Sequence, residues 1–329
     1  MSKLFRAVLL TLGICAAAPP PAMAQAEYPS KPVKFVVPFA AGGGIDITAR
    51  MAAEKVSETL GQQIVVQNQG GAGGAIATAA VIKADPDGYT LLYHSTTGTV
   101  HSAITDNLGY DWLNDLVPVS IITRFAPVMV ISPTLPANNM AEFVALLKAN
   151  PGKYSFASSG AGSAIHLVAE FFLQRAGVTM VHVPYRGTGA AMTDLLAGRI
   201  AMMVDGVPPQ AQNIKSGVVT AVAVTTATRA PAIPNIPTMK ELGYDFEVPF
   251  RTALYAPKNT PKAVVDKVAA ASQKAMSDAG LVKRLSDIGT ESVSSTAAEL
   301  DTLNRSQFKL YRDIVQSNKA LLQGSKPPQ

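Results

Sequence analysis

Short apolar runs alternate with longer amphipathic segments along most of the chain. Residues 33–37 (VKFVV) predict a buried strand, and residues 46–60 predict a helix because their apolar side chains recur every three or four positions. Further strands are expected at 64–67 and 90–94, with a helix between them that ends near residue 84. Strands separated by helices are typical of an α/β architecture with mostly parallel sheets.

The same alternation restarts in the middle of the chain. The strands expected there are 128–131, 154–157, 180–183, 200–204 and 218–225, and the helices are 139–150, 163–176 and one ending near 196. The last third, from Pro261, is predicted to be helical over 261–278, 281–288 and 300–317. At about 150 residues per domain, a chain of this length is long enough for two domains.

Two apolar stretches, 117–131 and 218–225, are places where the chain could cross between two lobes and form a hinge. From these crossings we predict a first lobe made of residues 25–124 and 225–329. The second lobe is predicted to span residues 125–224.

The first 24 residues match a cleavable secretory signal. Two basic residues precede an apolar run at 7–18, and the segment ends in the small-x-small pattern Ala22-Met23-Ala24. The run is shorter than the roughly 20 residues that span a bilayer, so we predict cleavage after Ala24 and a periplasmic mature protein. A lipoprotein anchored through Cys15 is the alternative, which bulky Ile14 disfavours.

Loss of this leader changes the chemistry that the chain can perform. Cys15 is the only cysteine, so the mature protein would have no disulfide, thiol nucleophile or cysteine-bound metal. The chain has 28 Lys and Arg against 23 Asp and Glu, and the leader removes two basic residues, which leaves 26 − 23 = +3. This weak, scattered charge indicates no nucleic-acid or membrane partner. We expect a monomer without metal or cofactor.

Small-residue loops follow several predicted strands and open the next helix, at 38–44, 96–99 and 158–163. A helix start presents about four unpaired N–H groups and a partial positive charge, and glycine lets an anion approach them closely. Because the carboxyl ends of parallel strands meet at one edge of a sheet, the three loops together predict a site for a small anion. Tight turns are the alternative reading of each single loop.

No complete catalytic or nucleotide-binding motif is present. Gly71 and Gly73 are followed by Ile76 where a dinucleotide fingerprint requires a third glycine, and no P-loop, His-Glu-x-x-His or Gly-x-Ser-x-Gly motif occurs. Ser163 and His166 share one helix face, but no acid is evident that would orient them as a nucleophile and base.

Two aspartates stand at the ends of predicted elements. Asp205 follows a buried strand and could accept a hydrogen bond from a ligand hydroxyl or ammonium, or brace a neighbouring loop. An ordinary Asp-Gly turn is the equal alternative. Asp46, at the first helix start, is interpreted as a cap that stabilises the helix by around 1 kcal/mol.

A series of motifs resembles the Bug receptors, which are the extracytoplasmic solute-binding proteins related to the TctC component of tripartite tricarboxylate transporters. In chain order the motifs are YPSKPV from Tyr28, VPFAAGGG from Val37, GGAGG from Gly70, PDGYT from Pro86, ASSG from Ala157, HVPY from His182 and DLLAG from Asp194. The resemblance covers essentially the whole mature chain.

The resemblance implies a type II periplasmic-binding-protein fold, with two lobes that each hold a mostly parallel sheet and are joined by a two-strand hinge. It further implies that second-lobe backbone and hydroxyl groups hold a ligand carboxylate while first-lobe loops hold bridging water. The matching positions are Phe39, Ala41 and Gly43 for the water; Ser158, Ser159 and Ser163 for the carboxylate; Asp205 at the facing strand end; and Thr96 and Thr97 nearby. The implied function is capture of a small carboxylate for a membrane permease.

One segment departs from the family pattern. Many relatives carry Trp-Phe-Gly before Leu-x-Ala-Pro, whereas this chain reads RTALYAP from Arg251. We hypothesise that this strand end borders the cleft, so that Arg251 forms a bidentate pair with a second ligand carboxylate. A solvent-facing arginine is the alternative.

Two other functions remain open at this point. An orphan binding protein could present its ligand to a sensor kinase without a permease, and an exported α/β hydrolase or transferase could use Ser163. Dicarboxylates, acidic amino acids and aromatic acids all fit an anion site at helix starts, so the sequence leaves the ligand unidentified.

Overall fold

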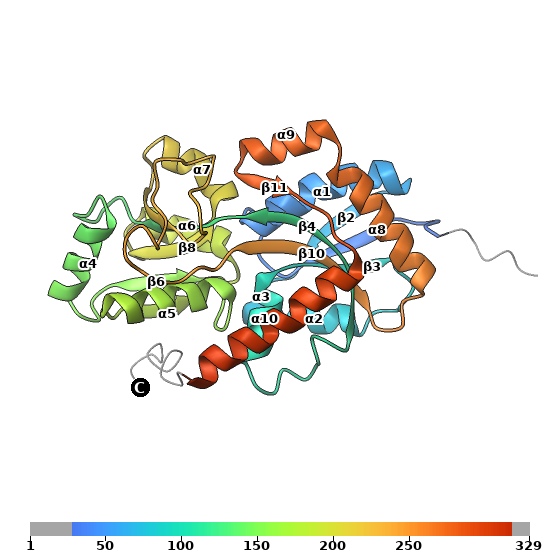
Figure 1. Ribbon diagram of the computed structural model, residues 1–329, viewed down its shortest axis with the longest axis horizontal. Helices are drawn as coiled ribbons and strands as arrows, with labels where there is room; N and C mark the ends of the chain where they lie inside the picture. Colours follow the sequence, from blue (N-terminus) through green and yellow to red (C-terminus); the bar gives the residue numbers. More distant parts are fainter. Residues whose placement is uncertain (1–27, 318–329) are drawn as a thin grey trace, which may run out of the picture.

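The computed structural model describes residues 28–317, so the predicted leader and its cleavage site lie outside the described residues. Two sheets, each flanked by helices, form two lobes joined by long strands (Figure 1). The α/β class is confirmed.

The first sheet has six strands in the order β11-β4-β10-β3-β1-β2. Its strands are β1 (Val33–Val37), β2 (Ile64–Asn68), β3 (Thr90–Ser95), β4 (Leu116–Phe125), β10 (Phe250–Pro257) and β11 (Thr290–Ser292). The helices around it are α1 (Gly44–Leu60), α2 (Ala75–Ile82) after the 3₁₀ turn η1 (Ala72–Gly74), α3 (Thr96–Ile104), α8 (Lys262–Met276), α9 (Ala279–Asp287) and α10 (Ala297–Ser317).

The second sheet has five strands in the order β7-β6-β8-β5-β9. Its strands are β5 (Pro127–Ile131), β6 (Ser155–Ser158), β7 (Val181–Pro184), β8 (Met202–Gly206) and β9 (Thr220–Val224). The helices are α4 (Met140–Ala149), α5 (Ala164–Ala176), α6 (Thr188–Leu196) and α7 (Val207–Lys215). Helix α7 was not predicted; it begins with prolines in its first turn, where proline is well tolerated.

Most strands of each sheet run in one direction. Strand β1 is parallel to β2 and β3, and β6 is parallel to β7 and β8. The exceptions include β5 and β10, which each pair antiparallel with both neighbours. These two are the strands that the chain enters immediately after it passes from one lobe to the other.

The chain crosses between the lobes first within the stretch 117–131, because β4 continues through Ala126 directly into β5. The second predicted crossing, at 218–225, was wrong. Strand β9 belongs to the second sheet, where Val224 pairs with Val128, and Val248 N still donates to Thr225 O at 2.9 Å. The chain returns only at Phe250, which pairs with Phe125 of β4. We therefore propose 126–249 as the second lobe.

Helix α1 shows how the amphipathic pattern builds a core. Its predicted stripe, which includes Ala49, Ala52, Val56 and Leu60, is buried against one face of the first sheet together with α8. A fully buried aliphatic side chain stabilises a fold by roughly 1.5–3 kcal/mol. The opposite face of the same sheet holds a second cluster, which includes Trp112 and reaches Leu300 of α10.

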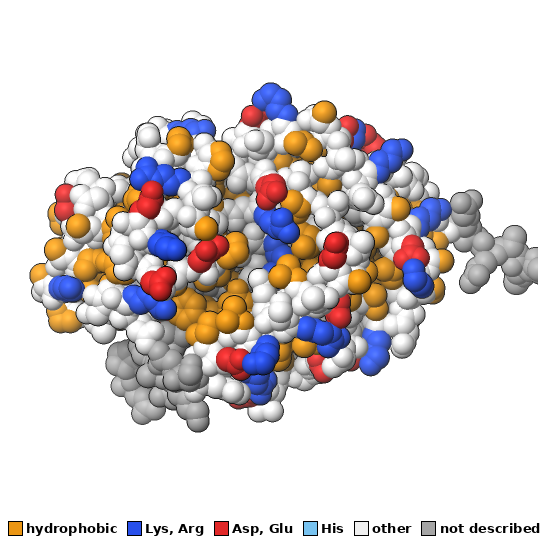
Figure 2. Space-filling view, viewed as in Figure 1, with side chains coloured by type: hydrophobic (Ala, Val, Ile, Leu, Met, Phe, Trp, Pro, Cys, Tyr) orange, Lys and Arg blue, Asp and Glu red, His pale blue; other side chains and the backbone are white. Residues whose placement is uncertain are grey.

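Two surface features bear on possible partners. On the face shown in Figure 2, basic and acidic side chains are interspersed without a block of one sign. Within residues 28–317, no helix combines the length and the apolar character needed to cross a membrane.

Candidate ligand-binding site

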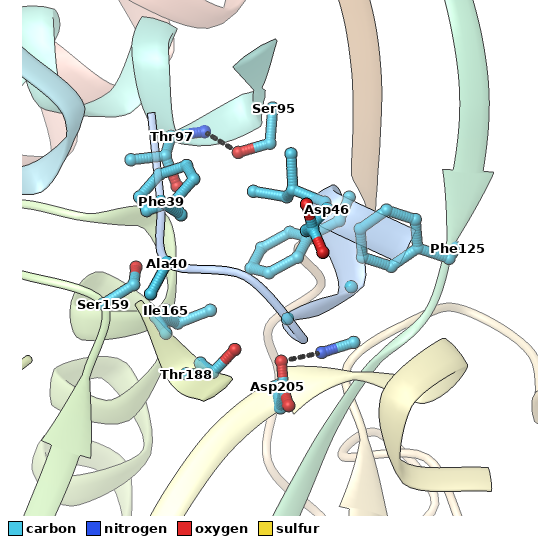
Figure 3. A pocket seen from close by; sticks show the side chains of 15 residues that line it. Phe39, Ala40, Asp46, Ser95, Thr97, Phe125, Ser159, Ile165, Thr188 and Asp205 are labelled. Atoms are coloured by element: carbon cyan, nitrogen blue, oxygen red, sulfur yellow. Dashed lines mark hydrogen bonds between the residues drawn. The ribbon is translucent and has the colours of Figure 1, made fainter. Parts of the chain in front are cut away.

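A small cavity lies between the lobes, at the carboxyl ends of their strands (Figure 3). Its walls come from the loops after β1, β3, β6, β7 and β8, and from Phe125 and Phe250 on the two crossing strands. The cavity volume is ≈ 30 Å³, about the share of one water molecule in the liquid. The lobes are therefore closed on each other, and a larger ligand requires them to part.

Contacts between the lobes surround this cavity. Ala40 N of the first lobe donates to Arg186 O of the second at 2.8 Å. Ala164 N, in the first turn of α5, donates to Thr97 Oγ1 across the cleft at 3.2 Å. These two bonds hold the first-lobe loops against the second lobe.

Five helices begin at the cavity. Residues from the starts of α1, α3, α5, α6 and α7 line it, namely Gly44, Thr97, Ile165, Thr188 and Gly206 at the N-cap of α7. Each helix start carries a partial positive charge of about half a unit. Some of the first N–H groups are already bonded, as Thr97 N is to Ser95 Oγ and Ala164 N is to Thr97 Oγ1. No Lys, Arg or His is found among the described residues that line the cavity. Among these lining residues, any attraction for an anion would therefore have to come from backbone dipoles and N–H groups, beside the carboxylates of Asp46 and Asp205.

Asp46 shapes the first-lobe loop. Its carboxylate accepts hydrogen bonds from Gly42 N at 3.0 Å and Asn68 Nδ2 at 2.9 Å, and it pairs with Arg50 at 2.9 Å. Burial disfavours its charged form, but the bonds from Arg50, Gly42 and Asn68 outweigh burial and lower the pKa of Asp46. The interpretation of Asp46 as the helix cap was wrong, because α1 begins at Gly44 with Gly43 as its N-cap and without a side-chain cap bond. Asp46 lies in the first turn, where it binds Gly42 N of the preceding loop and also lines the cavity.

The predicted carboxylate loop follows β6. Ser158 Oγ donates to Gly160 O at 3.0 Å and lies 2.6 Å from His182 Nε2 on β7. Its hydroxyl is therefore already hydrogen-bonded within the second lobe. Ser163 Oγ accepts from His166 N as the N-cap of α5. Ser159, by contrast, lines the cavity.

The side chains of Ser163 and His166 do not form the nucleophile–base pair that was considered from the sequence. The ring of His166 accepts from Gly162 N through Nδ1 at 3.1 Å and stacks on His182 with 3.9 Å between ring centroids. Ser163 meets only the backbone N–H of His166, not its ring. Over residues 28–317, no group of three His, Cys, Asp or Glu side chains could hold a metal ion.

Asp205 is 4% exposed and lines the cavity. It accepts hydrogen bonds from Gly206 N and Gln210 Nε2, both at 2.8 Å. Burial raises its pKa to about 6, against the opposing effects of the hydrogen bonds from Gln210, Thr188 and Gly206. Asp205 therefore belongs to the cavity wall as well as to the Asp-Gly turn.

The structure brings half of the predicted site residues to the cavity. The predicted residues that line it are Phe39, Gly43, Thr97, Ser159 and Asp205. The predicted residues that do not line it are Ala41, Thr96, Ser158, Ser163 and Arg251. Sequence reasoning missed Ser95, Phe125, Ile165, Thr188 and Phe250. Thr188 could have been found, because it follows a predicted strand and opens a helix.

The structure corrects the hypothesis for Arg251. Side chains alternate along a strand, so Phe250 faces the cavity while the Arg251 guanidinium donates to Asn304 Oδ1 at 2.8 Å and to Gln307 on α10. At 5% exposure Arg251 is not solvent-facing either. It ties β10 to α10 behind the cleft.

Arg251→Met is expected to lower the free energy of unfolding by about 2–3 kcal/mol, because buried partners lose a charged donor. Affinity for every carboxylate that binds should stay within about twofold. Urea unfolding and calorimetric titration would measure the two effects, with Arg124→Met on neighbouring β4, an exposed position, as control. Selective loss of dicarboxylate binding at unchanged stability would restore the cleft hypothesis.

Two lobes that meet at their strand ends, linked by two crossing strands and closing on a cavity lined by helix starts, define a solute-binding protein of the type II periplasmic-binding-protein fold. Comparisons with known proteins agree. The chain belongs to the TctC family, the tripartite tricarboxylate transporter family receptors, which it matches over residues 48–320.

Relatives cover nearly the whole chain. A protein of Agrobacterium vitis, from the TAR-I ttuE-ttuC′ intergenic region, is 40% identical over 96% of this chain and 91% of its own length. The periplasmic binding protein BugD has a similar structure, with a TM-score of 0.85 and 36% identity over 88% of this chain and 98% of BugD. MatC of Rhodopseudomonas palustris with bound malate gives a TM-score of 0.84 and 29% identity over 88% of this chain and 100% of MatC.

Proposed function

We propose that this receptor captures a small carboxylate between its lobes, outside the cytoplasmic membrane, and delivers it to a membrane permease. The observation that carries the proposal is the convergence of five helix starts on one cavity without a basic side chain in its wall. Backbone N–H groups at helix starts bind carboxylates without further charge. Ser159, Thr97 and Thr188 add hydroxyl groups from both lobes.

Contacts from both lobes also explain how ligand binding would favour the closed form of the receptor. A ligand shifts the population toward closure only through contacts that the open form lacks. A carboxylate touching α5 of the second lobe and the Phe39–Gly44 loop of the first would meet this requirement. The malate bound to MatC is a small carboxylate in a relative of the same fold.

The periplasmic location and the permease remain part of the proposal. Support comes from the signal-like residues 1–24, from the similarity to the periplasmic binding protein BugD and from the transporter family to which the receptor belongs. A receptor that serves a permease would be required for uptake of its ligand, whereas a purely sensory receptor would not. Uptake of labelled ligand by cells with and without the receptor therefore separates the two functions.

A thermal-shift screen of residues 25–329 against small carboxylates tests the binding function. At a concentration of 100 times its Kd, a ligand adds about 2.7 kcal/mol of stability, so at least one carboxylate should raise the melting temperature clearly. The matched amide or methyl ester should not, because it lacks the anion. Stabilisation by neutral compounds alone, or Ser163-dependent ester hydrolysis, would contradict the proposal.

A further inference from the structure

Two carboxylates line the ligand cavity, and their surroundings differ. Asp46 is paired with Arg50 at 2.9 Å, so its negative charge is compensated within the first lobe. Asp205 receives hydrogen bonds from Gly206 N and Gln210 Nε2, both at 2.8 Å, and Thr188 lines the same cavity. Among the residues that the structure describes, none of these partners or of the cavity-lining side chains is a cation that could compensate Asp205.

A buried carboxylate without a cation is unfavourable, since water has been removed from it and no opposite charge replaces the water. Within the cavity the difficulty grows when the ligand binds, because its carboxylate adds a second negative charge. A carboxylate group offers about four acceptor positions, and two amide donors, Gly206 N and Gln210 Nε2, bond to Asp205. Acceptor positions of Asp205 therefore remain for a donor that the ligand can supply.

We infer that the ligand supplies this donor as an ammonium group, which pairs with Asp205 while the ligand carboxylate meets the start of α5. The inference rests on the proposed function and narrows it to small amino acids. Figure 3 shows Asp205 and Ser159 at different points of the second-lobe wall with Thr188 between them, so the two charged groups of a zwitterion have separate places. A zwitterion also adds no net charge beside Asp205.

An opposite arrangement uses the same residue. Asp205 could remain protonated and donate its proton to a ligand carboxylate, in which case an ammonium group would be unnecessary. The two arrangements differ in their response to pH. Ammonium recognition requires ionised Asp205 and weakens as pH falls through the range in which this carboxyl takes up its proton, whereas the protonated form binds a carboxylate more strongly as pH falls.

Calorimetric titration with ligand pairs that differ only in the ammonium group tests the inference. Aspartate with succinate, glutamate with glutarate, and alanine with propionate are suitable pairs, measured at pH 8 and pH 5. For the pair that contains the preferred ligand, the amino member should bind at least about tenfold tighter than its partner at pH 8. This ratio should shrink at pH 5.

Asp205→Asn keeps the size of the side chain and removes its charge, so it should reduce the ratio to near one by weakening the amino member alone. Asp245→Asn, at an exposed position of the same lobe, should leave the ratio unchanged. Equal or tighter binding of the desamino member, or tighter binding by Asp205→Asn, would overturn the inference while leaving carboxylate capture intact. Absence of binding by every carboxylate would overturn the proposed function as well.

Discussion

Gly189→Ala is expected to abolish ligand capture, although both lobes should remain folded. Gly189 is the second residue of α6 and does not have a positive φ, so its own backbone accepts a side chain. A Cβ atom there would lie 2.5 Å from Ala41 O and 3.2 Å from Gly43 N, both in the first-lobe loop. These atoms belong to backbone, so the contact can be relieved only by moving the lobes or the loop apart.

The substitution separates closure from local stability. Alanine is favoured over glycine in a helix by up to about 1 kcal/mol, so α6 itself should not be weakened. Closed-state contacts such as Ala40 N to Arg186 O lie on the same side of the cleft and should lengthen together with the blocked contact. We expect affinity to fall by at least about 100-fold, which corresponds to roughly 2.8 kcal/mol.

Gly280→Ala is the matched control. Gly280 is also the second residue of a helix, α9, and a Cβ atom there would meet only the side-chain oxygen of its own helix cap, Asp278, at 3.2 Å. Calorimetric titration and small-angle scattering should show normal binding and ligand-induced compaction for Gly280→Ala, and neither for Gly189→Ala. Normal compaction in Gly189→Ala would show that the first-lobe loop yields and that glycine is not required.

Asp205→Asn is expected to remove the loss of stability that the ligand-free protein undergoes when Asp205 ionises as pH rises. Burial raises the pKa of Asp205 from 3.8 to about 6, so the folded state favours the neutral carboxyl. The contribution of a group with a raised pKa is fully present below pH 3.8 and is lost as pH rises through about 6. A pKa difference of one between the folded and unfolded states corresponds to about 1.4 kcal/mol, so about 3 kcal/mol of stability should be lost between pH 4 and pH 7.

The informative quantity is the difference between the variant and the wild type. Other carboxyls, such as Asp46 with its lowered pKa, change the total stability in the opposite direction as pH rises. Urea unfolding should be measured at several pH values. The free energy of unfolding of the variant, relative to that of the wild type, should rise by about 3 kcal/mol from pH 4 to pH 8. A difference in the free energy of unfolding that is constant with pH would mean that the pKa of Asp205 is the same in the folded and unfolded states. Ionisation of Asp205 would then not destabilise the folded protein.

The same residue would then connect stability with ligand choice. A ligand ammonium would compensate the charge that burial disfavours, so ligand-induced stabilisation of the wild type should exceed that of the variant mainly above pH 6. This trade of stability for recognition is common at functional sites. It also explains why an aspartate without a cationic partner stands in a cavity built for an anion.

Local pattern was sufficient for most of the elements. The stripe of α1 and the loop-to-helix junctions after β1, β3 and β6 depend on neighbours within a few residues, and each was predicted from the sequence. The anion-binding edge followed from the same information, because parallel strands bring their carboxyl ends together. Family resemblance then supplied the two-lobed fold.

Three features of the protein were determined only by the tertiary structure. Alternation along a strand defines two faces but not which face meets the cavity, so the sequence placed Arg251 in the cleft whereas the fold turns it toward Asn304. The apolar pattern of β9 shows burial but not which sheet it joins, and its pairing with β5 moved the second crossing to Phe250.

The third feature that only the tertiary structure determined is the arrangement of residues in the closed cleft. The sequence by itself determined an α/β architecture with helix starts suited to an anion, because those features arise from short-range periodicity and turn chemistry. The tertiary structure alone decided that Gly189 faces Ala41 and that, within residues 28–317, neither the hydrogen-bond partners of Asp205 nor the side chains lining its cavity include a cation. Both facts depend on which distant segments come together, and local sequence preferences carry no information about that distance.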